Sequence, residues 1–191
     1  MRICVYGASS NDISPIFINA GEQLGYEMAK RNIGLTFGGG ANGMMGAVAR
    51  GITKGDGNII GVAPKFFNVD GVLYEHCDEM IRPDTMRQRK QIMEDNADGF
   101  IVTPGGIGTF EEFFEILTLK QLGQLNKPIV IMNTDGYYDD MLNMMQTAVE
   151  KDFILESVKS LYAVLTDINE ILDYIQDYNC DKIDINDYKK V

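Results

Sequence analysis

The sequence contains little of what metal centres and disulfide frameworks require. Its three cysteines, Cys4, Cys77 and Cys180, are widely spaced and form no CxxC pair, which indicates a reducing compartment rather than a disulfide framework. The single histidine, His76, excludes acid-base catalysis by two histidines, and the chain shows no cluster of metal ligands. We therefore expect no metal site, and we expect His76 to lie in a loop or at the surface.

Basic residues and long apolar runs are also scarce. The chain has 17 Lys and Arg against 28 Asp and Glu, a net charge of −11, and its basic residues are scattered. A polyanion is bound through a basic patch that displaces counterions, so this composition argues against nucleic-acid and anionic-membrane partners. The apolar run in the opening MRICVYGASS is too short for a signal peptide or a membrane span, so we expect a cytoplasmic protein.

What is present is typical of a soluble globular protein. Of the 191 residues, 45% are hydrophobic and 24% are charged, and this length can close one sizeable core. No linker, repeat or low-complexity block interrupts the chain. We expect a single domain over residues 1–180 and a polar, frayed tail over residues 181–191.

Short apolar runs alternate with segments of helical period along the whole chain. This alternation is typical of βαβ units and predicts an α/β fold, a Rossmann-like three-layer doubly wound sheet of about seven parallel strands. The predicted strands cover 2–7, 34–39, 58–63, 79–83, 99–105, 127–133 and 161–166. The predicted helices lie near 15–31, 43–54, 85–96, 109–123, 137–150 and 167–178.

Three loops that follow predicted strands are glycine-rich or polar, at 6–11, 37–46 and 103–109. Ligands of such sheets bind outside the carboxyl ends of the strands. In the third loop, glycines let backbone amides approach a ligand, and Thr109 suits the N-cap of a helix whose N-terminus would attract phosphate. A tight connection with no ligand is the alternative. Neither glycine loop is a Walker loop or a clean GxGxxG.

The helix predicted from Thr109 carries an unusual carboxylate. Phe110, Phe113, Phe114 and Leu117 form a core face, and Glu111 with Glu115 forms a solvated one. Glu112 instead begins a second apolar stripe that continues through Ile116 and Leu119, which suggests burial against the sheet on one side and a partner subunit on the other. Glu112 could simply stabilise the helix N-terminus, and it could do so and also be catalytic.

The segment 83–95 places two cations in an apolar stripe. Met86, Arg89, Lys90 and Met93 fall at i, i+3, i+4 and i+7. Long basic side chains can lie along apolar surface simply by snorkelling, so a partnered, functional Arg89 is one of two interpretations.

These motifs resemble the LONELY GUY (LOG) family of cytokinin riboside 5'-monophosphate phosphoribohydrolases. The family pattern PGGxGTxxE is present from Pro104 to Glu112, and the family's Met-x-x-Arg-Lys is present as Met86, Arg89 and Lys90. Similarity continues through YGASS, GGGANGMMGAVA, LGQLNKPIVIMN and DGYYDDML, and so covers nearly the whole chain. Leu119 and Leu125 replace a tryptophan and a histidine common in the family, which bears on substrate preference and on the subunit interface.

The resemblance implies a Rossmann-like homodimer that needs no cofactor. It would cleave the N-glycosidic bond of a purine nucleoside 5'-monophosphate, either AMP or an N6-substituted cytokinin ribotide, to the free base and ribose 5-phosphate. Glu112 and Arg89 would be catalytic, and Asp84 or Glu79 could serve the leaving base. By the same resemblance, the residues that contact substrate would be Ser10, Gly39, Gly40, Glu79, Met86, Lys90, Gly105, Gly106, Ile107, Gly108 and Thr109.

The same residues leave two other functions to compare with this one. Some members of the family carry a lysine decarboxylase label, but the chain offers no separate segment suited to pyridoxal phosphate on a Schiff-base lysine. A non-catalytic carrier of a phosphorylated ligand could use the same glycine loops. Simple carriage would require neither Arg89 nor Glu112.

Overall fold

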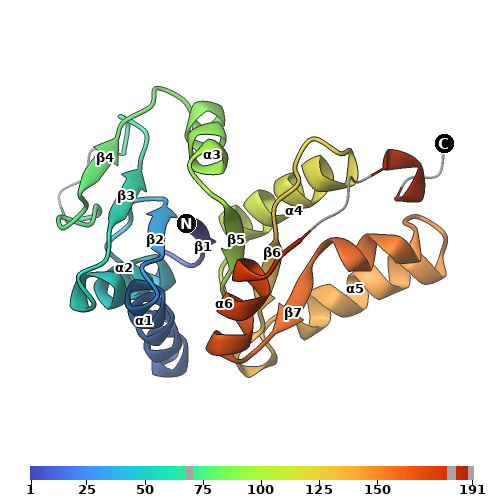
Figure 1. The fold of residues 1–191 in the computed structure, drawn as a ribbon, viewed down its shortest axis with the longest axis horizontal. Helices are drawn as coiled ribbons and strands as arrows, with labels where there is room; N and C mark the ends of the chain where they lie inside the picture. Colours follow the sequence, from blue (N-terminus) through green and yellow to red (C-terminus); the bar gives the residue numbers. More distant parts are fainter. Residues whose placement is uncertain (68–70, 180–183, 189–191) are drawn as a thin grey trace.

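The computed structural model describes residues 1–67, 71–179 and 184–188 and contains one parallel sheet of seven strands in the order β4-β3-β2-β1-β5-β6-β7 (Figure 1). The predicted doubly wound α/β sheet is thereby confirmed. Each strand lies within its predicted range: β1 Arg2–Tyr6, β2 Gly34–Phe37, β3 Ile59–Val62, β4 Glu79–Ile81, β5 Gly99–Val102, β6 Ile129–Met132 and β7 Ala163–Leu165.

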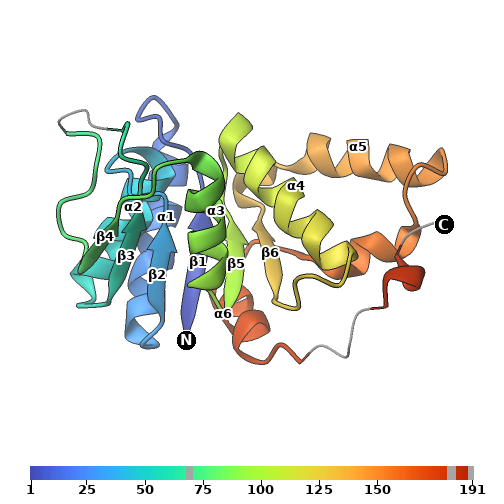
Figure 2. The same ribbon diagram turned by 90° about the horizontal axis from the view of Figure 1, so that it is seen from above.

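Helices cover both faces of the sheet, as Figures 1 and 2 show from two directions. One face packs against α1 (Pro15–Lys30), α2 (Gly43–Lys54) and α6 (Ile168–Gln176). The other packs against α3 (Met86–Asp95), α4 (Ile107–Gln121) and α5 (Asp139–Glu150). Three short 3₁₀ segments complete the described elements: Thr134–Gly136, Glu156–Leu161 and Ile185–Asp187.

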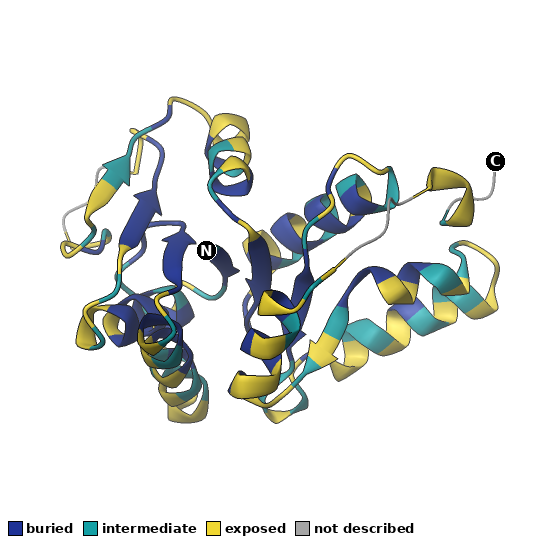
Figure 3. Ribbon diagram, in the orientation of Figure 1, coloured by how far each residue is buried: buried dark blue, intermediate teal, exposed yellow. Residues whose placement is uncertain are grey.

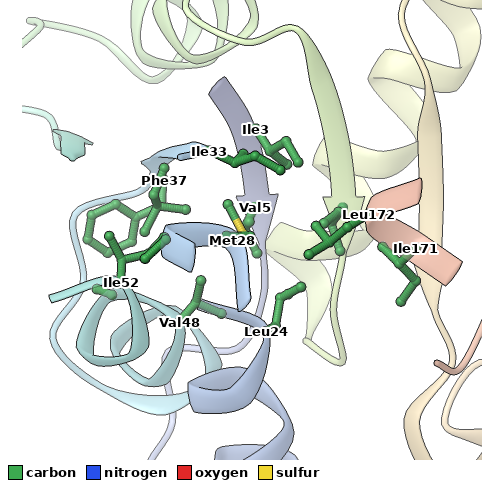
Figure 4. Packing of buried hydrophobic residues seen from close by; sticks show 14 of the residues in the cluster. Ile3, Val5, Leu24, Met28, Ile33, Phe37, Val48, Ile52, Ile171 and Leu172 are labelled. Atoms are coloured by element: carbon green, nitrogen blue, oxygen red, sulfur yellow. The ribbon is translucent and has the colours of Figure 1, made fainter. Parts of the chain in front are cut away.

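The central strands are buried on both faces, which explains why they read as continuous apolar runs (Figure 3). Alternate side chains of β1 enter opposite cores. Ile3 and Val5 pack among residues of α1, α2 and α6, part of the cluster in Figure 4. Cys4 and Tyr6 point to the other face, toward residues of α3 and α4.

Helices α1 and α2 cross at close range because each presents a glycine to the other. A Cβ added at Gly25 would overlap the backbone of Val48, and one added at Gly51 would overlap the backbone of Glu22. A larger residue at either position would force the helices apart. The close crossing therefore fixes α1 and α2 against each other, and the loops after β1 and β2 lead into these two helices.

Two expectations for α4 were wrong. The helix begins at Ile107 with Gly106 as its N-cap, so Thr109 lies inside the first turn and does not cap it. The glycines allow the chain to leave β5 and enter the helix earlier than Thr109. The helix also buries one continuous face rather than two, formed by Thr109, Glu112, Phe113, Ile116, Leu117 and Lys120. Glu112 lies at the edge of that face, and Ile116 is covered within the same chain.

Part of the expected tail lies against the body of the protein. The carbonyl of Tyr188 accepts a hydrogen bond from Gln121 of α4 at 2.6 Å, and that of Asp187 accepts one from Ser157 at 2.6 Å. Residues 181–183 and 189–191, together with Cys180, are outside the described residues, and the division at residue 180 stays a prediction. Among the helices described, none is long and apolar enough to cross a membrane.

Candidate active site

The three loops singled out in the sequence meet at the carboxyl ends of β1, β2 and β5. The chain proceeds from β1 outward to β4 and then returns to β5 on the other side of β1, so β1 and β5 flank the topological switch point. The amide of Ala8 donates to the Pro104 carbonyl at 3.0 Å, and the amide of Met45 donates to the Ala8 carbonyl at 3.2 Å. The loop after β1 thus ties the other two loops together.

A cavity of about 440 Å³ opens above these loops. This volume falls in the range of small-molecule sites. Its walls come from all three loops, from α3 and α4, and from the segment after β3, and they include Gly7, Ala8, Ser9, Gly38, Gly40, Asn42, Met45, Phe67, Val72, Leu73, Met86, Arg89, Gly106, Ile107, Gly108, Thr109 and Glu112. A more open depression on α3, lined by Asp84 and Arg87 among others, contains neither a glycine loop nor Glu112.

The two glycine loops differ in whether their helix has amides left for a ligand. At the start of α2, the amide of Gly43 donates to the Asn11 side chain at 2.9 Å, and the amide of Met45 donates to Ala8. At the start of α4, no side chain of the described residues caps the helix, and Gly106, Ile107 and Gly108 line the cavity. The α4 N-terminus is therefore the end of this cavity whose geometry suits an anion.

Arg89 and Glu112 form a buried ion pair in the cavity wall. Nη1 of Arg89 lies 2.7 Å from Oε1 of Glu112, and the two side chains are only 8% and 9% exposed. Nε of Arg89 also donates to the Val62 carbonyl, at 3.1 Å, at the end of β3. The guanidinium is thus held from two sides, by the sheet and by α4.

The position of Arg89 depends on a glycine. A Cβ added at Gly38 would overlap Nη2 of Arg89, so only glycine lets the guanidinium lie against the end of β2. Burial raises the pKa of the Glu112 carboxyl, and the charge of Arg89 acts in the opposite direction. Arg89 therefore favours the charged form of a carboxylate that lines the cavity and whose charge burial disfavours.

Lys90, the neighbour of Arg89, faces a different set of groups. It forms ion pairs with Glu111 and, at 2.7 Å, with Glu115 on α4, and it does not line the cavity. Burial acts to lower the pKa of Lys90, but the two carboxylates outweigh it and raise the pKa. Lys90 therefore links α3 to α4 through ion pairs outside the cavity, next to the Arg89 and Glu112 pair.

The structure brings some predicted substrate residues to the cavity and leaves others outside it. Met86, Gly40 and residues 106–109 line it. Ser10 instead accepts a hydrogen bond from the Asp12 amide, and the exposed Glu79 is on edge strand β4. Gly39 and Gly105 are beside the cavity and do not line it. Asp84 pairs with Lys65 at the exposed start of α3.

Several lining residues were not predicted. Ser9 lines the cavity, whereas Ser10 was the residue expected to contact substrate. Phe67, Val72 and Leu73 come from the segment between β3 and β4, which has no periodicity or glycine motif to mark it. Apolar residues in a predicted loop were the signal that could have indicated a binding surface.

Glu94, near the end of α3, gives a prediction about stability. Burial, Glu115 and Asp95 raise the pKa of its carboxyl to about 7. Between the ordinary pKa near 4.5 and 7 the folded state keeps a proton that the unfolded state has lost, so stability falls as pH rises through this window. Glu94→Gln cannot ionise, and we expect its melting temperature to exceed that of the wild type by about 3–6 °C at pH 8.

The same comparison at pH 4.5 should show a much smaller difference, because Glu94 is then protonated in the folded protein. Thermal unfolding followed by circular dichroism measures both values. Glu75→Gln removes one charge from an exposed carboxylate and is the matched control. An equal shift for Glu94→Gln at both pH values would contradict the proposed burial effect.

Curated proteins similar in sequence to this chain are named as cytokinin riboside 5'-monophosphate phosphoribohydrolases, some of them as probable ones. A family model described as possible lysine decarboxylase matches residues 45–175. Cytokinin riboside 5'-monophosphate phosphoribohydrolase LOG2 of Arabidopsis thaliana is 35% identical over 177 residues, which cover 93% of this chain and 83% of the relative. A probable enzyme of the same name from Oryza sativa, LOGL2, is 36% identical over 178 residues, covering 93% of this chain and 73% of the relative.

Solved structures are similar in fold at lower sequence identity. The molybdenum cofactor binding protein of Rippkaea orientalis superposes with a TM-score of 0.68 at 20% identity, covering 92% of this chain and 93% of the other. The Moco carrier protein of Chlamydomonas reinhardtii gives a TM-score of 0.68 at 20% identity, covering 92% and 94%. These similarities support the fold and carry no functional argument.

Proposed function

This chain belongs to the LONELY GUY family of cytokinin riboside 5'-monophosphate phosphoribohydrolases, and from that premise we propose that it hydrolyses the N-glycosidic bond of purine nucleoside 5'-monophosphates. The products are the free base and ribose 5-phosphate. The observation that carries the proposal is the buried Arg89 and Glu112 pair, which lines the same cavity as the α4 N-terminus. A reactive carboxylate and an anion site are thereby brought together.

The α4 N-terminus holds the 5'-phosphate. Gly106, Ile107 and Gly108 line the cavity at this end, and the helix dipole favours an anion there. Glu112 is on the next turn of the same helix, so a phosphate bound at residues 106–109 fixes the ribose near its carboxylate. Binding energy from the phosphate thus positions the bond that breaks.

Glu112 stabilises the reacting sugar. As the base departs, C1' of the ribose gains oxocarbenium character, and a nearby carboxylate offsets this positive charge while it hydrogen-bonds the sugar hydroxyls or the attacking water. Water adds to C1' and gives up a proton, and the base leaves with the bonding electrons of the C–N bond and takes up one proton. Because the site of Glu112 is buried, its charge acts with little screening by solvent.

Arg89 keeps Glu112 ionised and oriented. A guanidinium does not release a proton at ordinary pH, so Arg89 is no general acid, but it can donate a hydrogen bond to the leaving base. Neither Asp84 nor Glu79 lines the cavity, so neither is placed to protonate the leaving base.

The other functions receive less support from this site. No lysine of the described residues lines the cavity, and Lys90 is engaged by Glu111 and Glu115, so a Schiff-base role has no candidate there. A carrier needs the anion site alone. It would have no use for a buried ion pair whose assembly requires Gly38.

Substrate preference depends on the apolar side of the cavity. Met45, Phe67, Val72, Leu73 and Met86 face it, which suits a purine base and leaves room for an apolar N6 substituent. Incubating the protein with AMP and with an N6-isopentenyl analogue, followed by chromatography of the released base, tests the proposal. Tight nucleotide binding without release of base would favour the carrier instead.

We also propose a symmetric dimer with its sites near the subunit boundary. The second stripe of α4 is covered within the chain, so the support comes from large apolar residues that line the cavity and are left exposed: Ile107 at 83% and Met86 at 39%. Light scattering at micromolar concentration should give an even-numbered assembly. A monomer under those conditions would rule out the dimer.

The remaining parts of the proposal concern partners and location. With a net charge of −11 and scattered basic residues, we propose a small nucleotide rather than a nucleic acid as the partner. The free Cys4 and Cys77 suit a reducing compartment, and we propose the cytoplasm.

A further inference from the structure

Two adjacent tyrosines, Tyr137 and Tyr138, form hydrogen bonds to the glycine loop at 103–109 and have no role in the proposed reaction. The hydroxyl of Tyr137 donates to the Gly105 carbonyl at 2.6 Å, and the hydroxyl of Tyr138 donates to the Thr103 carbonyl at 2.7 Å. Strand β5 ends at Val102, so both carbonyls are beyond the strand. Neither tyrosine lines the cavity, but the carbonyls that they hold come directly before residues 106–109, which do.

These bonds set the direction of the loop amides. The carbonyl of Pro104, between the two, accepts from the Ala8 amide at 3.0 Å, so three successive carbonyls of the loop are held. In a trans peptide the carbonyl and the next N–H point in opposite directions. Because the Gly105 carbonyl is held against Tyr137, the amide N–H of Gly106 points away from Tyr137. Gly106 is the N-cap residue of α4 and lines the cavity.

The tyrosines are themselves held by a hydrogen-bonded turn after β6. The Asn133 side chain accepts from the Tyr138 amide at 2.8 Å and donates to Asp139 at 2.7 Å. Gly136 has a φ of 68°, a left-handed conformation that lets the chain reverse before Tyr137. The Tyr137 ring packs edge-on against Phe17 of α1, with centroids 5.9 Å apart, while Tyr138 is fully buried.

We propose that Tyr137 and Tyr138 are positioning residues that aim the α4 glycine loop at the substrate phosphate. The inference rests on the proposed function, because it assumes that this loop binds phosphate. Without the two hydroxyls the glycines would be free to rotate, and glycine peptides have little intrinsic preference for one orientation. The two hydroxyls thus hold the loop in one conformation before the ligand binds, so binding does not have to offset the entropic cost of ordering it.

Tyr137→Phe tests this inference, since it removes one hydroxyl from a side chain that is 41% exposed. We expect the Kd for ribose 5-phosphate, measured by calorimetry, to rise about tenfold. The loss on AMP should fall mainly on KM rather than kcat, because the bond that breaks is at Glu112. Tyr138→Phe should show the same loss, together with a lower melting temperature, since it leaves a buried carbonyl unpaired.

Tyr162→Phe is the matched control, because Tyr162 is a buried tyrosine whose hydroxyl contacts the Met145 sulfur and no part of the loop. It should bind ribose 5-phosphate as the wild type does. Unchanged binding in Tyr137→Phe, with a wild type that does bind, would overturn this inference and leave the proposed function intact. A wild type that binds no ribose 5-phosphate would overturn both.

Discussion

Replacing Glu112 with Gln is expected to lower the turnover of a nucleoside 5'-monophosphate by about a hundredfold or more, while nucleotide binding survives. The substitution keeps the size of the side chain and much of its hydrogen bonding, but removes the negative charge that offsets the developing charge on ribose. Base release and calorimetric titration with AMP, performed on the same preparation, separate the two effects. The melting temperature shows whether the buried Arg89 still folds into place without its partner.

Glu111→Gln is the control for this experiment. Glu111 is the preceding residue of the same helix, its side chain is 51% exposed, and it pairs with Lys90 rather than Arg89. Its loss should change turnover only slightly. If Glu112→Gln retained full activity, the catalytic assignment would have to be abandoned.

Removing Arg89 should act through Glu112. Arg89→Ala takes away the charge that opposes the effect of burial, so the pKa of Glu112 should rise further and the acid limb of the pH-rate profile should move to higher pH. If the two residues act as a unit, the double variant should be little worse than either single variant. Additive losses would instead indicate independent roles.

Adenosine is expected to be a poorer substrate than AMP by about a hundredfold or more in kcat/KM. It lacks the phosphate that binds the α4 N-terminus, and with it the binding energy that places the ribose beside Glu112. Steady-state rates of adenine release from the two compounds measure the difference. Comparable rates would show that the glycine loop is only a tight connection between β5 and α4.

A substitution at Gly106 tests the same phosphate site by changing the protein instead of the substrate. An added Cβ at Gly106 would meet no described atom within 4 Å, and its φ of −95° is open to any residue, so Gly106→Val should fold normally. The new side chain would project into the space of the phosphate. We expect weaker AMP binding with a smaller change on adenosine, so the preference for AMP should shrink; an unchanged preference would place the phosphate elsewhere.

The sequence alone was sufficient to predict the elements of this protein and the type of its fold. Strands such as 99–102 were recognisable because burial on both faces leaves an unbroken apolar run, and helices such as 15–30 because their apolar residues recur with a period of 3.6. Both signals are local. The glycine loop at 105–108 was recognisable for a similar reason, since its residues are adjacent in the chain.

Tertiary structure alone decided which residues meet. Arg89 and Glu112 belong to different helices, and helical spacing on each says nothing about how α3 and α4 lie on the sheet or about the Val62 carbonyl and Gly38 that hold the guanidinium. The same limit applies to Lys90, which shares a stripe with Arg89 yet meets Glu111 and Glu115. Sequence periodicity reports which face of an element is buried, whereas the partners on that face depend on packing between elements distant in the chain.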